Sequence, residues 1–189
     1  MAKLKLQMQL SIDGYVASPN GEMAWAIWDW DQELKDYVKS ITSDVDCIVL
    51  GRKLAQGFIP YWASHPEEEG ADFMNAAKKV VFSKSLEKSE WENTSIAKGN
   101  IIQEIEALKN ENGKDLIVYG GAEFVTSLIE NDLIDEYHFF INPSIIGKGL
   151  GIFGITDNKS LQAKSARLFD CGIILLQYQK KGGQHGPNR

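Results

Sequence analysis

The sequence predicts an α/β protein built around a mainly parallel sheet. Three observations predict this class: short apolar runs alternate with amphipathic helices, a tight turn joins one strand directly to the next helix, and further strand-like segments gather near the end of the chain. Alternating strands and helices favour parallel crossovers, whereas consecutive strands favour antiparallel pairing. We therefore expect a mixed sheet with helices on both faces and antiparallel strands added late.

The amino-terminal third predicts two strands and a helix. Between residues 3 and 10, apolar residues alternate with lysine or glutamine, a period of two that is typical of a strand with one apolar face. After the Asp13-Gly14 turn, residues 15–17 predict a short extended piece. Asp31 is placed to cap a helix over residues 32–41, whose apolar residues recur at helical spacing.

The middle of the chain predicts buried strands and a second capped helix. Two short apolar runs, residues 47–50 and 80–82, have the pattern of strands that are buried on both faces. The stretch over residues 58–70 predicts an irregular excursion between them. Asn100 is placed to cap the next helix, which we expect to end at Asn112-Gly113.

The last third repeats the alternation and then changes to strands. Residues 116–119 predict a buried strand and residues 122–131 a helix, with only Gly120-Gly121 between them. Residues 137–141 and 173–179 predict the late strands.

Composition limits the class of protein. The chain has 189 residues, 43% of them hydrophobic, and a net charge of −6. Its apolar runs are too short for a membrane span, and the acidic balance argues against a nucleic-acid-binding face. We expect one domain over residues 1–181 and a disordered tail over residues 182–189, whose glycine-rich polar composition can bury little.

The cysteines and histidines predict no metal site. Cys47 and Cys171 sit singly in apolar runs, which favours buried reduced thiols over a disulfide or a catalytic role. Together with a start that is typical of a strand and not of a signal peptide, this favours a cytoplasmic protein. His65, His138 and the cysteines lack ligand spacing, and the zinc-deaminase signature is incomplete because the sequence holds no PCxxC motif.

Polar loops follow three of the predicted parallel strands: Gly51-Arg52-Lys53, Ser83-Lys84 and Gly120-Gly121-Ala122-Glu123. Ligands of open α/β sheets bind where such loops meet, outside the carboxyl ends of the strands. A Gly-Gly turn that opens a helix lets an anion approach free backbone N–H groups. The glycine pair could equally be only a tight turn, and Arg52 and Lys84 could be only solvated surface cations.

Gln7 and Gln9 share one face of the first predicted strand. Buried amides need partners or a cleft, so on a central strand they would line a pocket. On an edge strand they would only face water.

Six stretches occur in order along nearly the whole chain: residues 11–17 (SIDGYVA), 46–52 (DCIVLGR), 80–84 (VVFSK), 118–121 (VYGG), 133–136 (LIDE) and 142–153 (NP through GKG to F). Together they resemble the dihydrofolate reductase superfamily, in the bacterial branch related to the C-terminal reductase domain of the bifunctional riboflavin biosynthesis protein. The resemblance implies a three-layer fold, a central mixed sheet with flanking helices, and NADPH lying across the carboxyl edge of that sheet.

Carried over position by position, the resemblance implies a cofactor site. Gly51, Arg52 and Lys53 would hold the adenosine-side phosphates, with Ser83 and Lys84 near the 2′-phosphate. The turn between the strand and the helix would hold the pyrophosphate and the nicotinamide side, often with a cis Gly-Gly bond. Leu54 departs from the threonine of many relatives, which bears on the choice between NADPH and NADH. The remaining cofactor candidates are Gln9, Ala17, Lys98, Tyr119, Gly120, Gly121, Ala122, Glu123 and Phe124.

The substrate side is predicted over residues 23–31, where dihydrofolate reductases have a mobile loop, a tryptophan and an acidic residue. Trp25 and Trp28 are candidates for substrate contacts. Asp29, Asp31 and Gln7 are candidates for catalysis, although Asp31 could instead only cap its helix.

The function that these features predict is NADPH-dependent hydride transfer to a small heterocyclic or ribosyl-pyrimidine-like substrate. Such a reaction is similar to that of 5-amino-6-(5-phosphoribosylamino)uracil reductase or dihydrofolate reductase. The alternative is a nucleotide-binding sensor or interaction domain without turnover, because no proton donor is unambiguous. The relatives' habit of dimerising makes a homodimer possible.

Overall fold

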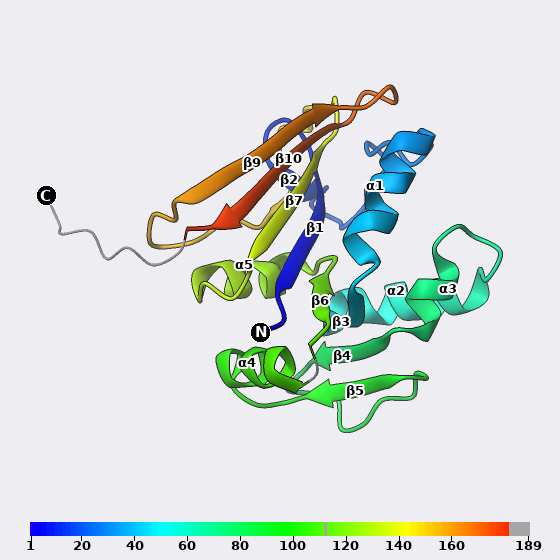
Figure 1. Cartoon of the computed structure of the whole chain (residues 1–189), viewed down its shortest axis with the longest axis vertical. Helices are drawn as coiled ribbons and strands as arrows, with labels where there is room; N and C mark the ends of the chain where they lie inside the picture. The colour runs from blue at the N-terminus through cyan, green and yellow to red at the C-terminus, as the bar shows by residue number, and fades with distance from the viewer. Residues whose placement is uncertain (112, 182–189) are drawn as a thin grey trace, which may run out of the picture.

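A computed structural model describes residues 1–111 and 113–181 (Figure 1). Its strands are β1 (Leu4–Leu10), β2 (Tyr15–Ala17), β3 (Val45–Gly51), β4 (Lys78–Phe82), β5 (Thr94–Ala97), β6 (Asp115–Val118), β7 (Glu136–Ile141), β8 (Leu150–Gly151), β9 (Leu161–Leu168) and β10 (Ile174–Lys180). Within the described ranges, eight strands form one sheet in the order β5-β4-β3-β6-β1-β7-β10-β9, and β2 pairs with β8.

The sheet is mixed, as the sequence predicts. The strands from β5 to β7 in that order are parallel to their neighbours, and β10 and β9 are added in antiparallel pairings. β1 lies between β6 and β7, with Leu6 beside Val118 and Gln7 beside His138. A central β1 excludes the alternative that Gln7 and Gln9 sit on an edge strand that faces water.

Helices cover both faces of the sheet (Figure 1): α1 (Gln32–Thr42), α2 (Arg52–Ser64), α3 (Ala71–Ala76), α4 (Ile101–Glu111) and α5 (Ala122–Glu130). α4 and α5 pack on one face through apolar side chains such as Ile105 and Leu128. α2 and α3 cover the other face over β3, β4 and β6, and α1 covers it over β7 and β10. This arrangement confirms the predicted layered α/β class.

The second face of β1 is buried together with its lysine and glutamines. All seven residues of the strand are buried, so the predicted polar face is not solvated. Lys5 lies within this face, where its Nζ donates to Ile41 O in the last turn of α1 at 3.0 Å and contacts Asp115 at 3.0 Å. A lysine that binds terminal helix carbonyls satisfies groups that have no partner inside the helix.

The prediction of an irregular segment over residues 58–70 is wrong for residues 58–64, because α2 continues to Ser64, whereas residues 65–70 lie in no helix or strand. Gly57 and Pro60 lower helix propensity, but Ala55 and Ile59 are buried against the sheet, and this packing outweighs the local preference. The edge strands β5 and β9 lack a clear apolar alternation and were not anticipated by the pattern. The predicted tail over residues 182–189 and the helix stop at Asn112 lie outside the described residues.

Candidate functional site

The structure brings the three predicted polar loops to one edge of the sheet. β3 and β4 pair so that Gly51 lies beside Phe82, and the ring of Phe82 packs against that of Phe124 with centroids 4.9 Å apart. A Cβ placed on Gly121 would lie 3.9 Å from the Gly51 Cα. The ends of β3, β4 and β6 therefore form one continuous surface.

Two helices begin side by side at this surface without a capping side chain. α2 follows Gly51 and α5 follows Gly121, and neither N-cap residue provides a side-chain hydrogen bond. By contrast, α1 is capped by Asp31, and Asn100 Oδ1 accepts from Ile102 N at the start of α4. The first N–H groups of a helix have no partner inside the helix and carry partial positive charge, so α2 and α5 together offer an anion site.

Close approach of the backbone explains why both positions are glycine. A Cβ on Gly51 would lie 2.8 Å from Phe124 Cβ, and Gly121 has a φ of +52°. Gly120 has a φ of +148°, and a Cβ there would lie 3.2 Å from Leu54 Cδ2. Leu54 thus packs under the turn as an apolar support and offers no hydroxyl to a phosphate.

The expected cis bond between Gly120 and Gly121 is a wrong prediction, because the described chain contains no cis peptide bond. The turn is made by the two positive φ angles, which glycine adopts without the steric cost that a Cβ imposes.

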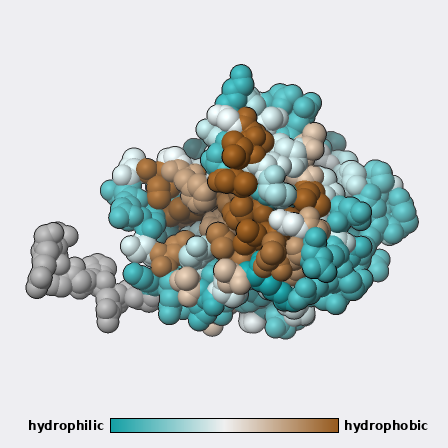
Figure 2. All heavy atoms as spheres, turned by 90° about the horizontal axis from the view of Figure 1, so that it is seen from above, coloured by the Kyte–Doolittle hydropathy of each residue, from teal (hydrophilic) through white to brown (hydrophobic). Residues whose placement is uncertain are grey.

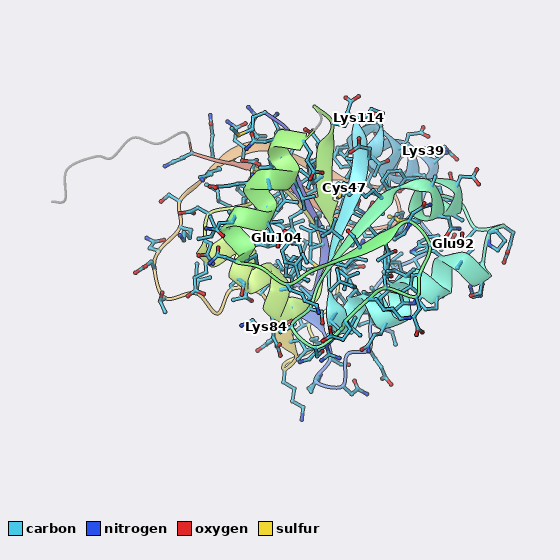
Figure 3. All side chains as sticks on the ribbon, turned by 90° about the horizontal axis from the view of Figure 1, so that it is seen from below. Lys39, Cys47, Lys84, Glu92, Glu104 and Lys114 are labelled. Atoms are coloured by element: carbon cyan, nitrogen blue, oxygen red, sulfur yellow. The ribbon has the colours of Figure 1, made fainter. Side chains whose placement is uncertain are left out.

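The cations predicted for this edge differ in their partners. Lys53 Nζ contacts Glu123 Oε1 at 2.8 Å and holds the pKa of that carboxyl below its usual value through the hydrogen bond. Lys98 pairs with Glu87 at 3.0 Å. Within residues 1–111 and 113–181, Arg52 and Lys84 form no ion pair, although Arg52 reaches Gln56 at 3.4 Å. Figure 3 shows Lys84 at the opposite end of the sheet from Lys114, which precedes β6.

The side chains of Ser83 and Tyr119 contact other residues of the protein. Ser83 Oγ accepts from Leu86 N at 3.0 Å and from Ser85 N at 3.2 Å, so it shapes the loop that carries Lys84. The ring of Tyr119 stacks on Phe58 of α2 with centroids 5.6 Å apart. Its buried hydroxyl has no partner among the described residues, and burial raises its pKa. Ala17 is buried in β2 and pairs with Leu150 of β8.

The substrate-side candidates lie around the carboxyl ends of β1 and β7. Gln7 Oε1 is buried without a partner among the described residues, whereas Gln9 Oε1 accepts from Asn142 Nδ2 at 2.8 Å. Asn142 Oδ1 accepts from Ile27 N at 2.8 Å, which ties the predicted substrate segment to β7. The Gly120 turn lies against β1, because a Cβ on Gly120 would lie 3.7 Å from Met8 Cε.

Within the segment, Trp28 and Asp29 are exposed and Trp25 is partly buried, with an indole nitrogen that has no partner among the described residues. Asp31 Oδ1 accepts from Leu34 N at 2.9 Å and Oδ2 accepts from Cys171 N at 2.9 Å. These two backbone bonds lower the pKa of Asp31. Asp31 is therefore the predicted helix cap, and the structure shows no contact between it and the three loops.

A buried polar chain that the sequence did not predict lies beneath α1. Tyr37 Oη and His138 Nδ1 are 2.6 Å apart, and His138 Nε2 lies 3.7 Å from Glu136 Oε2. Lys3 contacts Glu136 Oε1 at 2.7 Å. His138 and Lys3 together hold the pKa of Glu136 at about 2. Glu136 and His138 are polar residues in a strand that is otherwise aromatic or apolar. This pattern could have indicated the buried polar chain.

Apolar side chains gather in the middle of the face shown in Figure 2. Figure 2 views the molecule from the top of Figure 1, where β1, β7 and β9 end and β10 begins. Exposed apolar residues lie at these strand ends: Ile12 follows β1, Ile145 follows β7, Leu168 ends β9 and Ile174 begins β10. Leu168 and Ile174 are direct neighbours across β9 and β10.

The mixed sheet, its strand order and its flanking helices define an α/β protein of the dihydrofolate reductase-like class. A family model described as the RibD C-terminal domain matches residues 2–175, and the chain belongs to that family. The resemblance inferred from the sequence is thereby confirmed.

Similar proteins agree with this assignment. The uncharacterized protein YyaP of Bacillus subtilis is 30% identical over 95% of this chain and 96% of its own length. A putative riboflavin biosynthesis protein from Shewanella sp. PV-4 has a TM-score of 0.75 at 20% identity, covering 96% of this chain and all of that one. The Enterococcus faecalis dihydrofolate reductase complexed with NADP(H) has a TM-score of 0.66 at 12% identity, with coverages of 95% and 97%. The two structures establish the fold.

Proposed function

We propose that this protein is an NADPH-dependent reductase that transfers hydride to a small heterocyclic or ribosyl-pyrimidine-like substrate. The observation that carries the proposal is the pair of uncapped helix N-termini at Gly51 and Gly121, flanked by Arg52 and Lys84. A dinucleotide has several phosphates that such a surface can hold together. Membership of the RibD C-terminal domain family and the fold shared with an NADP(H)-bound dihydrofolate reductase support the same assignment.

The residues fit the cofactor in shape and charge. Gly51 and Gly121 leave the space that a Cβ would fill, so phosphate oxygens can approach the backbone there. Arg52, Lys53 and Lys84 supply local positive charge in an acidic protein, with the 2′-phosphate assigned to Lys84. The further cofactor contacts in this proposal are Gln9, Ala17, Ser83, Lys98, Tyr119, Gly120, Ala122, Glu123 and Phe124.

When bound, NADPH supplies the hydride, and this chain's residues supply orientation. Gln7 and Gln9 lie on the face of β1 that continues toward the Trp25–Trp28 segment, so we assign them and these indoles to the substrate side. Asp29 is exposed and has no hydrogen-bond or ion-pair partner among the described residues, whereas both oxygens of Asp31 are engaged by backbone N–H groups.

Titration with NADPH, followed by nicotinamide fluorescence with NADH as the control, tests the cofactor. Saturable binding that is stronger for NADPH is expected, and the absence of a saturable change with either cofactor would overturn the proposal. Oxidation of NADPH is then measured with pteridine, pyrimidine and carbonyl substrates.

A nucleotide-binding sensor is the second candidate function, because no proton donor is unambiguous. Both oxygens of Asp31 are occupied in capping its helix and binding Cys171 N. Saturable NADPH binding without oxidation across the three substrate classes would favour the sensor over the reductase.

We also propose a homodimer. The neighbouring exposed residues Leu168 and Ile174 and the exposed edge strand β9 support it, since apolar surface and free strand edges favour association. Light scattering should give twice the chain mass, and Leu168→Glu should reduce it to the monomer.

A further inference from the structure

Asn142 is a completely buried amide that joins three distant segments. It follows directly after β7, its Oδ1 accepts from Ile27 N at 2.8 Å, and its Nδ2 donates to Gln9 Oε1 at 2.8 Å and to Phe140 O at 3.2 Å. The substrate-side segment, β1 and β7 are therefore connected through one side chain.

The direction of these hydrogen bonds is set by the backbone. A backbone N–H can only donate and a backbone carbonyl can only accept. Ile27 N thus requires the oxygen of Asn142 on its side, and Phe140 O requires the nitrogen on the other. The nitrogen that faces Gln9 can only donate, so Gln9 must present its own oxygen to Asn142.

The consequence is a fixed orientation of the Gln9 amide. With Oε1 engaged by Asn142, Gln9 Nε2 is the group left for a ligand. Gln9 is itself buried, on the face of β1 that lies under the substrate-side segment. A donor held in this way selects a ligand that places a carbonyl oxygen or an unprotonated ring nitrogen opposite it.

We propose that Asn142 is a positioning residue that sets the donor polarity of Gln9 and at the same time holds the segment around Ile27 in place. The ligand part of this inference rests on the proposed function. The orientation of Gln9 and the holding of the segment do not, because they are properties of the free protein.

Three substitutions separate the two roles. Asn142→Asp, studied at a pH where the carboxyl is ionised, keeps an acceptor for Ile27 N but can only accept from Gln9, so the Gln9 amide must turn and present its oxygen to the ligand. Asn142→Ala removes both contacts. Gln9→Glu keeps the bond from Asn142 and replaces the free nitrogen by oxygen. Asn131→Ala is the matched control, since Asn131 Nδ2 binds only Ser127 O at the end of α5.

In the free protein, side-chain amide NMR and acrylamide quenching of tryptophan fluorescence test the inference. Three of the five tryptophans, Trp25, Trp28 and Trp30, lie in the segment. We expect Asn142→Asp to shift the Gln9 amide protons downfield and slow their exchange, with quenching unchanged. Asn142→Ala should increase quenching, and Asn131→Ala should change neither. An unaltered Gln9 signal in Asn142→Asp, or unaltered quenching in Asn142→Ala, overturns the inference.

Binding of two matched probes then tests the ligand part. Pterin carries a ring carbonyl where 2,4-diaminopteridine carries an amino group. We expect Asn142→Asp and Gln9→Glu each to shift the preference about tenfold toward the diamino probe, as a mismatched buried hydrogen bond requires. If the wild-type protein binds neither probe, pteridines are removed from the proposed substrate class, whereas the positioning role is still decided by the measurements on the free protein.

Discussion

Phe124 in the first turn of α5 closes directly on Gly51 at the end of β3, and a methyl group on Gly51 would lie only 2.8 Å from Phe124 Cβ. This contact brings the beginnings of α2 and α5 together. The proposed anion site therefore depends on the absence of a side chain at Gly51, a position where a polar loop alone would tolerate alanine.

Gly51→Ala should lower the free energy of unfolding by about 1–3 kcal/mol, since overpacking forces a shift of β3 or α5. The same shift should weaken NADPH binding. Chemical denaturation and cofactor fluorescence measure the two effects. Gly57→Ala in α2, the helix that follows Gly51, is the control, because its Cβ meets nothing within 4 Å. It should stabilise the protein by about 0.5–1 kcal/mol, and equal losses in both variants would contradict the role of the contact.

Gly121→Ala tests the positive φ of the turn. Alanine at a φ of +52° should cost about 1–2 kcal/mol of stability and disturb the start of α5. Gly113 has a φ of +79° and open space around it, so Gly113→Ala should carry a similar backbone cost. Only Gly121→Ala should reduce NADPH affinity in a fluorescence titration. A matching reduction in Gly113→Ala would show that general destabilisation is the cause.

Lys84→Gln tests the assignment of the 2′-phosphate. Loss of a charge-assisted hydrogen bond should weaken NADPH binding about tenfold and leave NADH binding nearly unchanged. The NADPH affinity should also become less sensitive to salt. Lys114→Gln makes the same change of charge at the opposite end of the sheet (Figure 3) and should have no effect on either cofactor. Equal weakening of NADPH and NADH by Lys84→Gln would contradict the assignment.

Asp31 can be tested as a helix cap separately from any chemical role. Asp31→Ala should lower the midpoint of thermal unfolding, because Leu34 N and Cys171 N both lose their acceptor. Asp31→Asn keeps the cap oxygen for Leu34 N and should recover most of that loss. If Asp31→Asn keeps its stability but loses turnover, the carboxylate has a catalytic role beyond capping.

Because of Glu136, the folded protein should lose stability in acid. Its pKa lies at about 2 in the folded protein, below the ordinary value of 4.5, so the folded state favours the charged carboxylate. The stabilisation is complete above pH 4.5 and is lost as the pH falls toward 2, because the unfolded chain then binds the proton first. Glu136→Gln should flatten this part of the stability profile measured by denaturation between those pH values. An unchanged slope would assign the acid sensitivity to other carboxylates.

Much of the fold was predictable because local patterns carry it. The alternation in β1, the apolar runs of β3, β4 and β6, and the caps Asp31 and Asn100 all act over a few residues. α2 was not predicted, since Pro60 opposes a helix locally and only burial of Ile59 against the sheet favours it. β9 was missed because its exposed residues show no apolar period.

The candidate site, like the fold, was predictable from the sequence only in part. Glycine pairs, cations after strands and the order of the motifs are properties of the sequence, so the α/β class, the superfamily and the three polar loops could be inferred from it alone. Which of these groups meet is decided by the tertiary structure. Gly51 and Gly121 are 70 residues apart in the numbering and come into contact only through the parallel pairing of β3 with β6. The bonds from Asn142 to Ile27 and Gln9 likewise join residues that no local pattern relates, because hydrogen bonding of a buried amide depends on the whole packed core.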